Sequence, residues 1–161
     1  MITIRHVAAE DATAISILLV SAFDQPNESR LIEALRAEGS VAHELVAVRN
    51  GEIIGHACLS HLRRPEGWLA LGPVSVRMDL QGQGYGAELI RYGLDAARQN
   101  QAKAVVVVGD PLYHHRFGFV FDGPAELSSP YPAQYTGLYP IAPETAVARV
   151  ELVYPVPFAE V

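Results

Sequence analysis

The sequence predicts an α+β domain: a mixed, mostly antiparallel sheet with flanking helices and one central pair of parallel strands. Three strand-like runs, at 43–50, 52–62 and 68–76, follow one another through tight turns, as in an antiparallel meander. An amphipathic helix pattern at 87–98 then leads to the continuously apolar run 103–109, which is typical of a strand covered on both faces. This strand–helix–strand order makes the two strands that flank the helix parallel. We expect a single domain made from the whole chain.

The N-terminal elements are a strand and two helices. Apolar and polar residues alternate at 2–7, which predicts the strand. Asp11 is placed to cap the first helix. The second helix is expected at 27–39, with Asn27 or Ser29 as its cap.

The later elements are predicted from turn signals and alternation. Asn50-Gly51 joins the first two strands of the meander and is the strongest short hairpin signal in the chain. The segment 110–119 predicts a short helix or turn that enters a strand near Phe119. The final strand is expected within 146–155, and the Pro- and Tyr-rich stretch before it is expected to form loops.

Composition excludes several classes of protein. Half of the residues are hydrophobic and 19% are charged, which excludes a disordered chain. The formal net charge of −6 disfavours a generic nucleic-acid binder and attraction to anionic membranes. Cys58 is the only cysteine and lies in an apolar run, so a buried structural thiol in a reducing compartment is expected. With no signal-peptide pattern and no apolar run long enough for a bilayer, the expected location is the cytoplasm.

Residues 81–86, Gln-Gly-Gln-Gly-Tyr-Gly, place three glycines just before the helix pattern. Glycines at a helix start allow backbone N–H groups to approach an anion, and the helix dipole favours negative charge there. The Gly-Lys-Ser/Thr of a P-loop is absent. Residues 82–87 do fit the G-x-G-x-x-A pattern of dinucleotide binding, with Asp110 at about the right distance, but five residues separate them from the preceding strand, and a meander comes before them.

Pro73 adds a second constraint, because proline cannot donate to a sheet ladder and implies a bulge or a break. A break at Gly72-Pro73 lets this strand diverge from the run at 103–109 and opens a cleft beside the glycine turn. The backbone groups of Val74 and Val76 are then unpaired and can bind a ligand as another strand would. Coenzyme A, which has a pyrophosphate and an arm with amide groups, suits this geometry.

Together these residues resemble the acetyl-CoA-binding core of the GNAT N-acetyltransferase superfamily. The stretch 71–90 matches its bulged strand, its Gln/Arg-x-x-Gly-x-Gly/Ala turn and its helix, and 105–119 resembles the next strand and the short helix that ends in a Gly-Phe pair. The combination is similar to a YhbS-like branch of predicted acetyltransferases. The resemblance implies the GNAT acyl-CoA N-acyltransferase fold with a splayed parallel strand pair, and acetyl-CoA as co-substrate. It implies that the cofactor-binding residues are Val74, Ser75, Val76, Gln81, Gly82, Gln83, Gly84, Tyr85, Gly86 and Ala87.

The resemblance also indicates where the proton donor for the departing thiolate lies. The family often has a tyrosine four residues before the glycine of the Gly-Phe pair, and in this chain that position is His114, preceded by Tyr113. Tyr113 and His114 are therefore the candidate catalytic residues, although both could simply pack. His56, His61 and Ser75 are weaker candidates for a base or a water-orienting group, and no spacing of histidines and carboxylates supports a metal site.

The amine acceptor is expected to meet the other side of the cleft, between the first two helices and the C-terminal segment. The candidate residues, which ordinary packing explains equally well, are Phe23, Tyr131, Tyr135 and Tyr139 for an apolar wall and Asp24 or Glu28 for attraction of a cation. The leading hypothesis is transfer of an acetyl group to a primary amine of a small molecule or protein, by direct attack in a ternary complex. The alternatives are a non-catalytic acyl-CoA sensor and, third, an NAD-binding oxidoreductase. A monomer and a homodimer are both compatible with the sequence.

Overall fold

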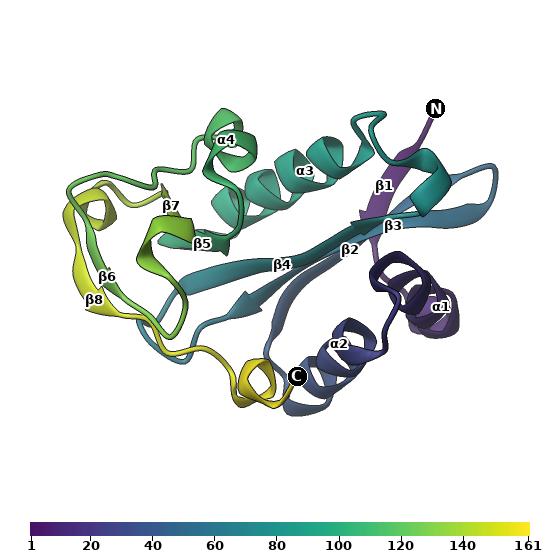
Figure 1. Ribbon diagram of the computed structural model, residues 1–161, viewed down its shortest axis with the longest axis horizontal. Coiled ribbons are helices and arrows are strands. Elements are labelled where there is room, and N and C mark those ends of the chain that lie inside the picture. Colours follow the sequence, from purple (N-terminus) through teal and green to yellow (C-terminus); the bar gives the residue numbers. More distant parts are fainter.

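The computed structural model describes residues 1–161 and contains a six-stranded sheet with helices on both faces (Figure 1). The strand order is β1-β2-β3-β4-β5-β7, and only the β4–β5 pair is parallel. The strands are β1 Thr3–His6, β2 Val41–Arg49, β3 Glu52–His61, β4 Trp68–Val76, β5 Ala104–Val108 and β7 Thr136–Pro140. The predicted mixed, mostly antiparallel sheet is confirmed.

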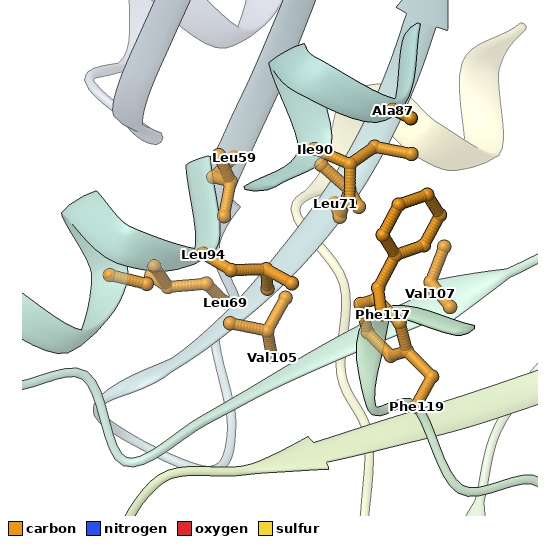
Figure 2. Close-up of a cluster of buried hydrophobic side chains, with 11 residues drawn as sticks. Leu59, Leu69, Leu71, Ala87, Ile90, Leu94, Val105, Val107, Phe117 and Phe119 are labelled. Carbon is orange, nitrogen blue, oxygen red and sulfur yellow. The ribbon is translucent and has the colours of Figure 1, made fainter. Parts of the chain in front are cut away.

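Three longer helices cover this sheet: α1 (Ala12–Phe23) and α2 (Asn27–Glu38) on one face, and α3 (Tyr85–Gln99) on the other (Figure 1). The short helix α4 (Pro111–His114) follows β5. Under α3, the buried side chains of Leu59, Leu71, Ile90 and Phe119 pack into one cluster (Figure 2). None of the helices combines the length and the apolar character needed to cross a bilayer.

The β2–β3 hairpin turns as its sequence predicts. Asn50 and Gly51 both have positive φ, 51° and 77°, which is the requirement of a type I′ turn. The strand β4 then pairs with β5 only from Trp68 to Leu71, whereas its pairing with β3 continues to Val76. The two parallel strands therefore separate at Gly72-Pro73, and the predicted splay is confirmed.

The predicted helix caps are only partly confirmed. Asp11 is the residue before α1, as predicted, but its carboxylate accepts the N–H of Ala8 and makes no capping hydrogen bond to that helix. Neither predicted residue caps α2, because the residue before this helix is Pro26 and no side chain caps it. The hydroxyl of Ser29 is instead 2.7 Å from that of Ser16, so this pair links the two helices.

The C-terminal third also differs from the sequence prediction. Residues 136–140, expected to be loop, form the edge strand β7 on β5. The expected final strand shortens to β8 (Arg149–Glu151), which pairs in parallel with β6 (Glu126–Ser128) in a separate small sheet. Near Phe119 there is a single bridge, from Val120 to Leu138, instead of a strand. The chain ends in a 3₁₀ turn that lies against α2 (Figure 1).

Candidate active site

The glycine turn joins the end of β4 to α3 and presents a row of free backbone amides. Gly82 and Gly84 have φ of 78° and 87°, values that side chains with a Cβ rarely adopt. None of the backbone N–H groups from Gly82 to Ala87 donates to an acceptor within the protein. With the N-terminus of a 15-residue helix behind them, these groups are suited to hold an anion.

The edge of β4 beyond the splay offers a second set of free backbone groups. The Arg77 N–H donates to the carbonyl of Ile54 on β3. Successive residues of a strand direct their backbone polar groups to opposite edges, so Val74 and Val76 face the gap left by β5. The side-chain amide of Gln81 donates to the Val76 carbonyl at 3.1 Å and ties the glycine turn to this edge.

A cavity of about 600 Å³ follows the splay from β4 to the start of α3. It is lined by all the predicted cofactor-binding residues except Gln83, whose side chain is exposed outside the cavity.

Four other lining residues were not predicted as cofactor-binding from the sequence: Ala22, Leu80, Ile90 and Arg116. Arg116 forms no ion pair with a carboxylate, and its guanidinium lies 4.5 Å from the centre of the Tyr113 ring. Its place beside the Gly-Phe pair was the only sequence signal that could have pointed to it.

Both candidate catalytic residues line this cavity. The Tyr113 hydroxyl lies over the first turn of α3, 3.5 Å from where a Cβ would sit on Gly86. The His114 ring packs edge-on against Tyr113 and Phe119, and its Nδ1 is buried without a hydrogen-bond partner. Burial lowers the pKa of His114; Asp110 opposes this shift and Arg116 adds to it. The imidazole of His114 is therefore neutral near pH 7.

A second cavity, of about 360 Å³, lies against the β4–β5 gap and shares Phe23, Val74 and His114 with the first. Among the predicted acceptor residues, Phe23, Glu28 and Tyr131 line it. The others do not: Asp24 and Tyr135 are exposed, and the Tyr139 ring packs against Phe119 and Arg98. The C-terminal residues Tyr154 and Phe158 also line it, and nothing in the local sequence had placed them there.

The weaker base candidates lie outside the region where the two cavities meet. His56 is fully buried on β3, and its Nε2 is 2.8 Å from Glu44 Oε2, while Arg36 binds the same carboxylate. Burial alone would raise the pKa of Glu44, but the hydrogen bonds from Arg36 and His56 lower it to about 2. His61 is exposed at the end of β3 and lines neither cavity.

The side-chain oxygen of Ser75 and the thiol of Cys58 are both buried. Ser75 contributes to the wall of the first cavity, but its Oγ is buried and has no partner. Cys58, the only thiol, is buried against the α1–α2 face, and burial raises its pKa to about 12. No cluster of three or more His, Cys, Asp or Glu side chains is arranged to hold a metal ion.

Comparison with known proteins places this geometry in a family. A family model described as Acetyltransferase (GNAT) family matches residues 8–119. An uncharacterized N-acetyltransferase, YhbS of Escherichia coli strain K12, is 32% identical over 126 residues, which are 76% of this chain and 75% of YhbS. A second uncharacterized N-acetyltransferase of that strain, YjhQ, is 30% identical over 133 residues, 78% of this chain and 71% of YjhQ.

The likeness extends to solved structures. A crystal structure of YhbS in complex with CoA has a TM-score of 0.91 and 27% identity, and the match covers 98% of this chain and 92% of that one. A GNAT family acetyltransferase from Brucella melitensis, in complex with acetyl-CoA, has a TM-score of 0.84 and 31% identity over 98% of both chains. These near full-length matches confirm the predicted GNAT fold.

Proposed function

Because this chain belongs to the acetyltransferase (GNAT) family, we propose that it moves the acetyl group of acetyl-CoA to a primary amine of a small molecule or protein. The amine attacks the thioester directly, in a ternary complex. The observation that carries this proposal is the meeting of two cavities at the β4–β5 splay, one of which has free amides at the far end.

The first cavity suits coenzyme A at both ends. The free amides at 82–87 and the N-terminus of α3 favour a pyrophosphate, although the chain as a whole is acidic. The Val74 backbone groups and the Val76 N–H face the gap left by β5 and can pair with the amides of a pantetheine arm as a further strand would, while the Val76 carbonyl already accepts from Gln81. Two similar structures, from Escherichia coli and Brucella melitensis, are complexes with CoA and acetyl-CoA.

Tyr113 and His114 supply the proton transfers. An ammonium must lose a proton before it can attack, and the departing thiolate gains one. His114 lines both cavities, and burial lowers its pKa, so its neutral imidazole accepts the proton of the amine. Tyr113 lines only the first cavity, where its hydroxyl donates to the thiolate.

The test is release of coenzyme A thiol from acetyl-CoA in the presence of primary amines, with calorimetry of acetyl-CoA binding. We expect amine-dependent release, and a loss of about 100-fold in kcat for Tyr113→Phe or His114→Gln with acetyl-CoA affinity nearly unchanged. Binding without turnover for every amine would instead support the sensor function, for which the histidine at the usual tyrosine position is the motivating observation. Absence of acetyl-CoA binding would contradict both.

A further inference from the structure

The second cavity has the walls of an apolar binding site. Eleven of its fifteen lining residues are hydrophobic, and they come from elements that are distant in the sequence. Phe23 is at the end of α1, Leu31 is on α2, and Val106 is on β5. The part of the cavity wall that the C-terminal third of the chain supplies is aromatic. It consists of Tyr131, Tyr154 and Phe158.

These three aromatic rings hold one another in place. The Tyr131 and Tyr154 rings meet edge to face, with centroids 5.0 Å apart, and Tyr154 meets Phe158 at 5.4 Å. Burial raises the pKa of both tyrosines, so the hydroxyls stay neutral. A ligand group with several charges would lose its hydration against this wall, whose hydrogen-bonding atoms are the hydroxyls of Tyr131 and Tyr154. An apolar or aromatic group gains by burial there.

Glu28 is the only carboxylate and His114 the only basic side chain among the lining residues. Glu28 is half-buried in the first turn of α2, five positions after Phe23, which lines both cavities. Its carboxylate accepts from the Gln25 side chain at 3.1 Å and has no Arg or Lys partner. An apolar cavity with one uncompensated negative charge fits a ligand with one positive charge.

We propose that the acceptor is a monoamine whose amino group is carried on a short chain by an aromatic or other apolar group. The ammonium pairs with Glu28 while the apolar group lies against Tyr131, Tyr154 and Phe158. A polyamine would bring further positive charges that find no carboxylate in this cavity, and an amino acid would bring a carboxylate that finds no cationic partner. This substrate class rests on the proposed acetyl transfer and narrows it.

Two measurements test the proposal separately from the proposed function. The first is calorimetric binding of 2-phenylethylamine, spermidine and phenylalanine to protein saturated with coenzyme A. The second is thiol release from acetyl-CoA with the same three compounds. We expect 2-phenylethylamine to bind at least about tenfold more tightly than the other two, and to exceed them by about 100-fold in kcat/KM.

Paired variants locate the two contacts. Glu28→Gln should raise the dissociation constant of 2-phenylethylamine about tenfold, whereas Glu33→Gln, on the exposed side of the same helix, should leave it unchanged. Tyr131→Ala should have a similar effect, and Tyr135→Ala, which changes an exposed tyrosine outside the cavity, should not. The affinity for acetyl-CoA should be the same in all four variants, which also shows that each is folded.

The outcomes separate the two proposals. Tighter binding or faster turnover of spermidine or phenylalanine would overturn the substrate class and leave acetyl transfer standing. Equal effects of Glu28→Gln and Glu33→Gln would also overturn it. A third outcome is that 2-phenylethylamine binds selectively and through Glu28, but no amine causes thiol release. This outcome would support the ligand class and overturn the proposed function.

Discussion

The glycines of the turn at 81–86 have different physical roles. Gly82 and Gly84 have positive φ, and a Cβ on either would meet no other atom, so backbone conformation selects glycine there. Gly86 has ordinary helical geometry in the first turn of α3, and its Cβ would lie 3.5 Å from the Tyr113 hydroxyl. A side chain at position 86 would therefore fill the free space next to the backbone amides of the turn.

Replacement of Gly86 should separate stability from binding. Alanine is a better helix former than glycine by about 1 kcal/mol, so Gly86→Ala should raise the free energy of unfolding by up to that amount. The added methyl group enters the first cavity, so affinity for acetyl-CoA should fall, and Gly86→Leu should abolish binding. Urea unfolding and calorimetry on the same samples measure both effects. Unchanged affinity in Gly86→Leu would contradict the placement of the pyrophosphate.

His114 should control the pH dependence of turnover. Its pKa is lowered below the usual 6.5, chiefly by burial, so the neutral form persists as the pH falls through 6.5. If that form accepts the proton of the amine, kcat should stay constant down to about pH 6.5 and decrease only at lower pH. The decrease should be absent from the residual activity of His114→Gln. A wild-type kcat that rises as the pH falls would show instead that the protonated imidazole acts as an acid.

At the scale of elements, the buried group Arg36–Glu44–His56 joins α2, β2 and β3. Arg36 binds both oxygens of Glu44, and His56 binds one of them from the adjacent strand. Replacement of this carboxylate by an amide leaves a partly buried guanidinium without its counter-charge and keeps one acceptor oxygen where the group uses two. Such a loss is more damaging than the loss of an exposed ion pair.

We therefore expect Glu44→Gln to lower the free energy of unfolding by about 2–4 kcal/mol. Glu33→Gln, an exposed substitution on α2, should change it by less than about 0.5 kcal/mol. Urea unfolding at pH 7 measures both. A loss below about 1 kcal/mol for Glu44→Gln would show that the group contributes little to holding α2 on the sheet.

The elements that could be predicted well from the sequence are those whose conformation is determined by residues close together in the chain. The residues Asn50-Gly51 form the hairpin turn themselves, and Pro73 interrupts the pairing of its own strand with β5. The edge strand β7 was missed because its pairing partner, β5, lies about thirty residues earlier and its Tyr and Pro residues resemble a loop. The expected final strand was too long for a similar reason: only Arg149–Glu151 finds a partner, in β6.

At the scale of the whole molecule, the same distinction applies to the site. The glycine turn at 81–86 is contiguous in sequence, so its residues can be identified together from the sequence alone. The second cavity is assembled from α1, α2, β4, β5 and the last residues of the chain, which meet only after folding. Phe158 reaches it because the C-terminal turn packs against α2 (Figure 1).

The arrangement of the two cavities leads to a prediction about kinetic order. They share the lining residues Phe23, Val74 and His114, so donor and acceptor can occupy neighbouring cavities at the same time. The Cys58 thiol and the Ser75 hydroxyl are both buried, so neither is placed to carry the acetyl group between two half-reactions. Double-reciprocal plots of initial rate, with acetyl-CoA varied at several amine concentrations, should therefore intersect. Cys58→Ala should keep the same pattern with kcat within about twofold.

A set of parallel lines would contradict the ternary complex, since it requires the acetyl group to rest on the protein between two half-reactions. Mass spectrometry of protein incubated with acetyl-CoA alone checks this independently, and we expect no added acetyl mass. Should an acetyl group be found, its position would identify the nucleophile. An acetyl group on Cys58 or Ser75 would also show that a buried group becomes accessible, whereas one on Tyr113 or His114 would lie on a residue that already lines the cavity.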